Sequence, residues 1–142
     1  MRALRVGIFA QTPGSDWVLQ HGLLDHAVLY AAQSGDPNEN PQSVVGKDLA
    51  AAKIDAAVVW GPVAGFLVNH HSDASWVVLP FKPDPRIRFD YELAMGVRFG
   101  EKEWKDTLDA WIGAHHDDID AILTRYHIPL LDEKGEIRQA RN

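Results

Sequence analysis

The sequence predicts an α/β domain in which helices flank a mostly parallel β-sheet. Segments rich in β-branched and aromatic residues alternate with helix-like segments along most of the 142 residues, which is the order expected of βαβ units. The composition, 46% apolar and 24% charged, is that of a globular protein. A chain of this length fits one ordinary domain with its own core. We therefore expect residues 1–142 to form a single α/β domain.

Five segments have the composition of strands. The first three are Leu4 to Ala10, Ala27 to Ala32 and Asp55 to Trp60. The third is apolar at successive positions, as strands covered on both faces are, so we expect it in the centre of the sheet. The other two are Trp76 to Phe81 and Tyr91 to Phe99, separated by a proline-rich loop.

Helices are predicted between these strands. The first begins in the loop of residues 11–16, where Ser15 or Asp16 is the candidate N-cap, and it continues from Trp17 to Asp25. The next two are predicted at Ser43 to Lys53, after the loop Gln33 to Pro41, and from Pro62 to Val68.

The C-terminal third has helical periodicity, with apolar or aromatic side chains three or four residues apart. We expect Gly113 and the cluster His115 to Asp118 to divide it into two helices. The tail after Leu131 is polar and is expected to fray. The recurring positions are Trp104, Leu108, Trp111 and His115, followed by Ile119, Ile122 and Tyr126.

Charge and composition argue against several functional classes. The formal net charge is −6 and the basic residues are scattered, so the basic patch of a nucleic-acid-binding protein is missing and we expect no nucleic acid partner. The chain contains no cysteine, which excludes disulfides, thiolate nucleophiles and cysteine-ligated metals. Its apolar runs are far shorter than the roughly 18 residues of a membrane span, so no membrane insertion is expected. The N-terminal segment is predicted to be a strand rather than a signal peptide.

The loop from Thr12 to Asp16 is the first candidate binding site. It joins a strand to a helix, where backbone N–H groups and the helix dipole favour an anionic group of a ligand. Only Gly7 and Gly14 are available there, so neither GxGxxG nor a Walker motif is present. An ordinary capped helix start explains the same residues, and both interpretations stay open.

Other candidate sites have simpler explanations. The doublets His70-His71 and His115-His116 lack the i, i+4 spacing of a helical zinc site, so we expect solvated histidines rather than a metal. No serine lies in a G-x-S-x-G motif, and acids such as Asp106 and Asp109 are expected to be solvated. We therefore expect no catalytic residues and no cofactor.

Trp60 is the most unusual aromatic residue. It stands at the C-terminal end of a predicted parallel strand, where open α/β sheets bind their ligands. Gly61 and Pro62 follow at once and turn the chain into the next helix. Trp104 and Trp111, in contrast, lie one heptad apart on one helical face and are expected in the core.

Three segments resemble a known family: KIDAAVVWGPVAGF at 53–66, YELAMGVRFGEKEW at 91–104 and AILTRYHIPLL at 121–131. They are similar to the C-terminal part of the periplasmic, family-3-type solute-binding-like proteins that accompany quinoprotein (PQQ-dependent) alcohol dehydrogenases, the methanol oxidation J-protein type. The resemblance covers nearly the whole chain, from VGIFAQTP to IPLL. Its most specific motifs are WGP, MGVR and the final Y-x-x-P-L-L.

The resemblance implies a type II periplasmic-binding-protein fold in which residues 4–80 form the second lobe. Residues 90–131 would then hold the strand that crosses back to the first lobe and the terminal helices that pack there. Most of the first lobe and the family's signal peptide have no counterpart in these residues. Apolar surface left uncovered would favour a homo-oligomer, formed through the MGVR strand and the helices around Trp104 and Trp111, or a partner that supplies the missing lobe.

The resemblance also implies where a ligand would lie. Amino-acid-binding relatives receive the ligand carboxylate on a Gly-Thr-type pair after the first strand, and Gln11-Thr12-Pro13 stands in that place. They bind the ligand ammonium with an aspartate five residues after an Asp-Ala pair, whereas Asp55-Ala56 is followed at that distance by Trp60. A buried ammonium without a carboxylate is strongly disfavoured, so an amino acid ligand is not expected. The expected contacts are Thr12, Ser15, Trp60 and Gly61.

The expected function follows from this resemblance. It is that of a non-enzymatic periplasmic accessory protein, which assists a quinoprotein alcohol dehydrogenase by binding that enzyme or a small ligand used in its maturation. The alternative is the substrate-binding component of an ABC-type transporter that recognises a small organic solute other than a standard amino acid. The periplasmic location is implied by the resemblance alone.

Overall fold

A three-stranded parallel sheet forms the centre of the fold. The structure is a computed structural model that describes residues 4–32, 36, 41–82, 84–91 and 93–138. The strands are β1 (Val6–Phe9), β2 (Ala27–Tyr30) and β3 (Ala56–Val58), in the order β2-β1-β3. Both neighbours of β1 run parallel to it. The predicted α/β class, with a parallel sheet flanked by helices, is confirmed.

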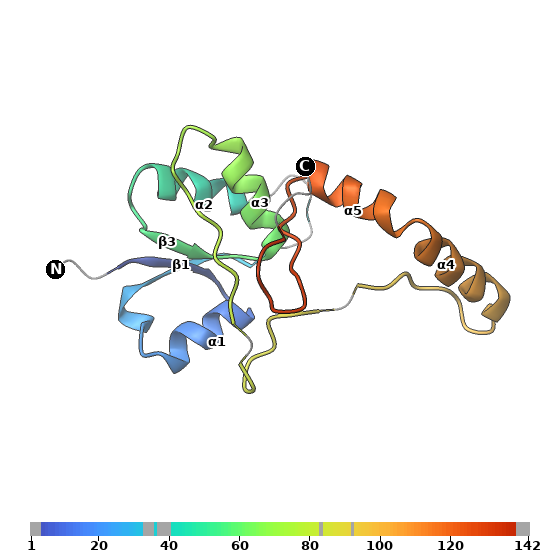
Figure 1. The fold of residues 1–142 in the computed structure, drawn as a ribbon. Coiled ribbons are helices and arrows are strands. Elements are labelled where there is room, and N and C mark those ends of the chain that lie inside the picture. The colour runs from blue at the N-terminus through green and yellow to red at the C-terminus, as the bar shows by residue number, and fades with distance from the viewer. Residues whose placement is uncertain (1–3, 33–35, 37–40, 83, 92, 139–142) are drawn as a thin grey trace.

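Helices cover both faces of the sheet. Figure 1 shows α1 (Pro13–Gln20) on one face and both α2 (Pro41–Ala50) and α3 (Gly61–His70) on the other. Right-handed crossovers explain this placement. The connection from β1 to β2 moves across the sheet in one direction and the connection from β2 to β3 returns past β1, so the same handedness puts their helices on opposite faces.

The apolar core lies mainly between the sheet and α2 and α3. Gly7 of β1 faces this layer, and a side chain there would stand 2.8 Å from Ile54 and 2.9 Å from the ring of Tyr30. Glycine at this position therefore leaves room for the Tyr30 ring and the Ile54 side chain to pack directly over β1. Ile8 points to the other face, as successive strand residues do, and both Ile8 and Val18 of α1 are buried. The main cluster consists of Tyr30, Val45, Ile54 and Leu67.

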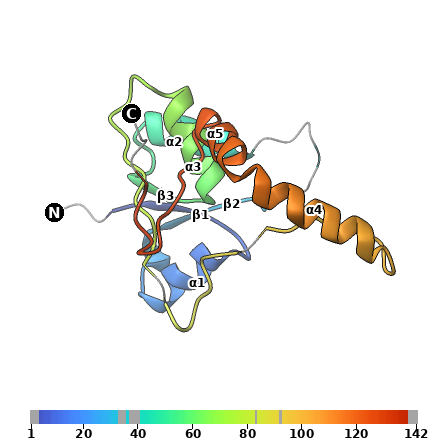
Figure 2. The same cartoon turned by 45° about the vertical axis from the view of Figure 1, so that its right-hand side comes forward.

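The C-terminal helices form an arm that leaves the sheet. Its helices are α4 (Lys102–Ala114) and α5 (His116–Arg125), and α4 lies farthest from the sheet in both Figures 1 and 2. The predicted division near residue 115 is confirmed. Every residue of both helices is half-buried or exposed, and the expectation that Trp104 and Trp111 lie in the core is wrong. Among the helices of the described residues, none joins the length and the apolar character needed to cross a bilayer.

Two predicted strands are wrong. The segments 76–82 and 93–99 form no strand, and the described residues between them contain one isolated bridge, from Asp84 to Ile87. β3 is an edge strand rather than the central one, and it is shorter than predicted. The physical reason is that a strand exists only where a neighbour pairs with its backbone N–H and C=O groups.

Smaller differences concern the ends of elements. The first helix ends at Gln20, and a separate 3₁₀ turn (Leu24–His26) precedes β2. Most of the loop predicted at 33–41 lies outside the described residues, although Pro41 begins α2. The tail is better ordered than expected up to residue 138, because Leu131 bridges to Ile137 and Arg138 pairs with Asp120 at 2.8 Å.

A polar network ties β2 to α2 at the edge of the core. The Tyr30 hydroxyl donates to Oδ2 of Asp48 at 2.9 Å, and Nζ of Lys53 donates to Oδ1 of Asp48 at 2.9 Å. Burial, and then the hydrogen bond and charge of Asp48, raise the pKa of Tyr30 to about 12. Hydrogen bonds from Lys53 and Tyr30 lower the pKa of Asp48.

We expect this network to give the protein a distinct alkaline stability profile. The raised pKa means that the folded protein holds the Tyr30 proton more tightly than the unfolded chain. The resulting stability is complete below about pH 10 and is lost as the pH rises to about 12. Tyr30→Phe should lower the free energy of unfolding by about 1 kcal/mol at neutral pH through the lost hydrogen bond, and it should flatten the decline above pH 10. Urea unfolding across this pH range measures both effects.

Tyr126→Phe is the matched control, because Tyr126 is exposed. It should change neither the neutral stability nor the alkaline slope. If Tyr30→Phe and Tyr126→Phe gave the same alkaline profile, the network would have no energetic role.

Candidate functional site

The carboxyl-terminal edge of the sheet is the candidate binding site. The three strands are parallel, so their ends at Phe9, Tyr30 and Val58 meet at this edge. The helix that follows β1 lies on one face of the sheet and the helix that follows β3 lies on the other, which makes the gap between these strands a topological switch point. The loop at Thr12 and the indole-bearing residue Trp60 flank that point.

Thr12, rather than Ser15 or Asp16, is the N-cap of α1. Its backbone is extended, with φ −119° and ψ 159°, and its hydroxyl donates to the carbonyl of Phe9 at 2.8 Å. The Ser15 hydroxyl donates to the carbonyl of Thr12 at 2.6 Å and accepts from the Thr12 N–H group at 3.2 Å. The prediction of the N-cap residue was therefore wrong by three or four positions.

These hydrogen bonds limit what the loop can bind. Both hydroxyl protons are directed to main-chain carbonyls, so they are occupied rather than presented to a ligand carboxylate. Oγ1 of Thr12 keeps the capacity to accept another hydrogen bond, while Asp16 adds a negative charge to the first turn of α1. The loop therefore favours a neutral hydrogen-bond donor over an anion. The capped-helix interpretation accounts for both hydroxyls.

Gly14 brings this loop against the end of β3. It is buried, and a Cβ atom at this position would stand 2.6 Å from Cγ1 of Val58. Only a residue without a side chain permits so close an approach. The structure thus brings the loop containing Thr12 and Ser15 to the strand that leads to Trp60. Gly14 was predicted to matter only for a phosphate-binding motif, and its packing role was not predicted.

Trp60 is the N-cap residue of α3 and presents its side chain to solvent. Its backbone is extended, with φ −64° and ψ 142°, and its carbonyl accepts from the N–H group of Ala64 at 3.0 Å. The side chain is 62% exposed. An indole offers an apolar face and a single N–H donor without charge. This edge therefore provides a stacking surface rather than a charged contact.

The segment that follows α5 packs on α3 next to Trp60. A Cβ atom at Gly61 would lie 3.6 Å from Cγ of Pro129, and one at Gly65 would lie 1.8 Å from the carbonyl oxygen of His127. Two glycines one helical turn apart therefore make a flat strip that receives residues 127–129. Gly61, expected as a ligand contact, is half-buried there. The Gly-x-x-x-Gly spacing of Gly61 and Gly65 is the signal in the sequence for this contact, which was not predicted.

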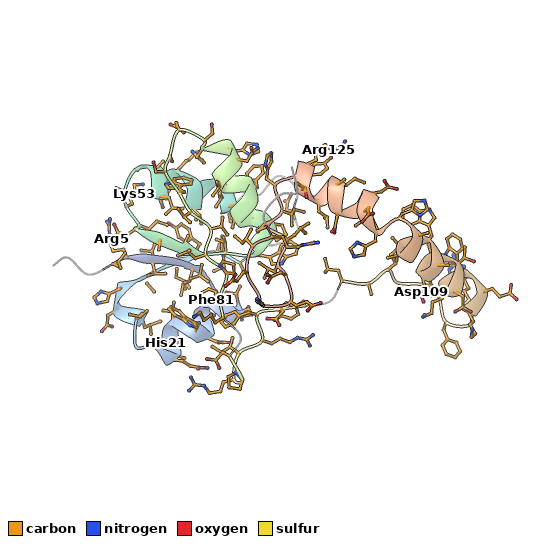
Figure 3. All side chains as sticks on the ribbon, in the orientation of Figure 1. Arg5, His21, Lys53, Phe81, Asp109 and Arg125 are labelled. Atoms are coloured by element: carbon orange, nitrogen blue, oxygen red, sulfur yellow. The ribbon has the colours of Figure 1, made fainter. Side chains whose placement is uncertain are left out.

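Asp55 lies at the opposite, amino-terminal edge of the sheet. Nε of Arg5 pairs with Oδ2 of Asp55 at 3.2 Å, and the Arg5 N–H group donates to the same oxygen at 2.9 Å. Figure 3 shows Arg5 and Lys53 at this end of the molecule, away from the arm that carries Asp109. The ion pair fastens the start of β3 to the start of β1. It also keeps this carboxylate away from the candidate site.

Three histidines close the ends of helices. His21, His70 and His115 each place Nδ1 within 3.0 Å of the carbonyl oxygen four residues back. Each ring also lies over the aromatic ring of that residue, which fixes the histidine against the last helical turn. Among the described His, Asp and Glu residues, no three lie close enough together to hold a metal ion. The aromatic partners are Trp17, Phe66 and Trp111, with ring centroids 4.2, 3.8 and 4.3 Å away.

We expect Gly65→Ala to dislodge the segment beside Trp60. The new methyl group would overlap the carbonyl oxygen of His127, which belongs to the backbone and can be relieved only by moving the chain. The free energy of unfolding should fall by about 1–3 kcal/mol, and protease cleavage near residue 127 should become faster. Gly113→Ala in α4 is the control, since nothing lies within 4 Å of that position. It should raise stability by up to about 1 kcal/mol. Equal effects of the two substitutions would contradict the packing described for Gly65.

Comparison with other proteins does not identify the family. The chain matches no protein-family model, no curated protein and no solved structure. The resemblance described above therefore rests on the residues that carry it, and the activity and partners that it implies are proposals.

Proposed function

We propose that this chain is a non-enzymatic, solute-binding-like accessory protein of the periplasm that assists a quinoprotein (PQQ-dependent) alcohol dehydrogenase. We further propose that residues 4–80 are the second lobe of a type II binding-protein fold. The dehydrogenase and the location come from the resemblance carried by WGP, MGVR and Y-x-x-P-L-L. The observation in the structure that supports a binding role is the exposed Trp60 at the switch point of a parallel sheet.

The site chemistry favours a small neutral solute. Trp60 offers a stacking surface, and Oγ1 of Thr12 offers an acceptor for a hydroxyl proton. The net charge of −6 and the nearby Asp16 both disfavour an anionic ligand. A short-chain alcohol has the matching features, because its alkyl group can pack on the indole while its hydroxyl group donates to Thr12.

The alternative is a receptor that delivers a small organic solute to an ABC-type transporter. It uses the same exposed indole, which suits a ligand held by stacking. A receptor binds its solute without the dehydrogenase, whereas an accessory protein binds the dehydrogenase itself. The two functions can therefore be told apart by whether the isolated chain binds a small solute or the dehydrogenase.

Trp60 should report ligand binding directly. Titration of the protein with short-chain alcohols should change its tryptophan fluorescence in a saturable way, with pyrroloquinoline quinone as the anionic comparison. Trp60→Ala should abolish the saturable change because it removes the stacking surface. Trp104→Ala should retain it, because that residue is on the distant arm and is similarly exposed. A saturable change that survived Trp60→Ala would place the ligand elsewhere.

The accessory role predicts a stable complex with the dehydrogenase. The immobilised chain should retain a purified quinoprotein alcohol dehydrogenase, and free chain should compete it off. Retention of the enzyme with no response to alcohols would favour the accessory role over the receptor. If the enzyme were not retained and its activity did not respond to added chain, the accessory function would be wrong.

A further inference from the structure

The segment from Tyr91 to Phe99 has a strand's sequence, and its described residues pair with no strand. Apolar side chains occupy every second position of YELAMGVRF, which is the pattern of a strand with one buried face. Yet Leu93 is 85% exposed, Met95 is 58% exposed and Phe99 is fully exposed. The segment therefore has an apolar face that the rest of the described chain does not cover.

The solvent-accessible surface of the chain is larger than that of a compact monomer of the same mass. It exposes 11276 Å², whereas a compact protein of 15.8 kDa exposes about 7,300 Å². The excess is roughly 4,000 Å² per chain, and obligate dimers bury about 1,000–2,500 Å² on each chain. A second chain docked on the exposed arm would account for a large part of this excess.

Helix α4 also has apolar side chains that are left partly exposed. Trp104, Leu108 and Trp111 form an apolar stripe, and the two tryptophans are each about half exposed. On the other side of the helix, Lys102 pairs with Asp106 and Lys105 pairs with Asp109. Helices of 13 and 10 residues, such as α4 and α5, are marginal in water unless their apolar face is packed. The stripe therefore requires a partner.

We propose that residues 91–99 pair antiparallel with the same residues of a second copy of this chain, with Met95 on the twofold axis. In this register Tyr91 lies opposite Phe99 and Leu93 lies opposite Val97, so the five apolar residues of each strand share one face. Cross-strand pairs of this kind stabilise antiparallel strands. The proposal does not depend on the proposed function.

Charge complementarity supports this register. On the other face of the ribbon, Arg98 of each copy falls opposite position 92, which is a glutamate in the sequence and lies outside the described residues. Opposite charges directly across an antiparallel pair are favourable. Moving the axis by one residue, to Gly96, would pair Leu93 with Phe99 but would leave Tyr91 opposite Glu101.

A two-stranded ribbon needs a cover, and α4 supplies it. Such a ribbon is marginal alone, because one whole apolar face stays in water. Helix α4 follows the segment directly, after a turn in which Gly100 has φ +90°. We place the stripe of Trp104, Leu108 and Trp111 from both copies on the apolar face of the ribbon.

Symmetric pairing also distinguishes this assembly from strand addition to the sheet. β2 and β3 are the edge strands of the described sheet. If residues 91–99 of one copy added to such an edge in another copy, the contact would be head-to-tail and would propagate unless exchange was reciprocal. Self-pairing about a twofold axis closes after two chains.

Single-cysteine variants test the register, since the chain contains no cysteine. Met95→Cys should cross-link into a covalent dimer under mild oxidation, because the two sulfur atoms would meet at the axis. Val97→Cys is the matched control on the same face. Its two copies would lie four residues apart along the ribbon, roughly 13 Å, and should stay uncross-linked. Equal cross-linking of both variants, or of neither, would overturn the register.

Mass measurement tests the dimer itself. Light scattering of the wild-type chain at micromolar concentration should give the mass of two chains. Met95→Glu places two like charges at the axis and should halve that mass. The circular dichroism spectrum should lose the strand signal of the ribbon and part of the α4 helix signal, while the sheet domain still unfolds cooperatively. Leu79→Glu, at an equally exposed apolar position in the other unpaired segment, should remain a dimer. A wild-type monomer would show that the surface serves a different protein, and a filament would show edge addition; either result would overturn the proposal.

Discussion

Strand β1 is hydrogen-bonded on both of its edges, and the other elements of the sheet domain are positioned through it. Val6 pairs with Ala27 of β2 on one side and with Ala56 of β3 on the other. Its two inner residues divide the core between the faces, with Gly7 toward the helices α2 and α3 and Ile8 toward α1. Because Gly7 has no side chain, the ring of Tyr30 and the side chain of Ile54 come within van der Waals contact of the strand itself. A small sheet can therefore hold a packed core with very few strands.

The small size of the sheet also explains why apolar segments outside it remain unpaired. Each edge of β1 has its partner, but among the described residues no strand pairs with the outer edge of β2 or of β3, and two further apolar segments join no sheet. Backbone groups in these segments have no strand partner among the described residues, which is tolerable only while water can hydrate them. Their side chains nevertheless belong to a buried environment. The fold thus consists of a sheet domain whose strands are hydrogen-bonded to one another and an arm whose apolar side chains remain exposed.

Local sequence signals predicted the elements that depend on local contacts. The division between α4 and α5 and the parallel direction of the first three strands follow from periodicity and from turn residues, whereas the expected central position of the third strand is wrong. The strands predicted at Trp76 to Phe81 and Tyr91 to Phe99 are wrong because pairing is a property of two segments, and the composition of one segment cannot supply the second. The N-cap at Thr12 was missed because Ser15 has the same chemistry, and only the backbone conformation decides which hydroxyl caps the helix. Trp60 and the loop at Thr12 were placed at one edge correctly, whereas the covering of Gly61 by Pro129 depends on a contact between segments far apart in sequence.

The part of the chain that carries the arm is fastened to the sheet domain both before α4 and after α5. At its beginning, Phe81 lies against Trp17 of α1, with ring centroids 5.0 Å apart, and stacks on Phe89 at 4.7 Å. At its end, the carbonyl of His127 rests on Gly65 of α3. Between these anchors Ile87 is still buried, but neither α4 nor α5 packs closely on an element of the sheet domain. The ordering entropy of these two helices is therefore not offset by burial within the chain. A partner that packs on α4 would supply the missing burial without having to disturb either anchor. The segment beside Trp60 would then stay in place, and the candidate site and the arm are able to serve separate binding partners.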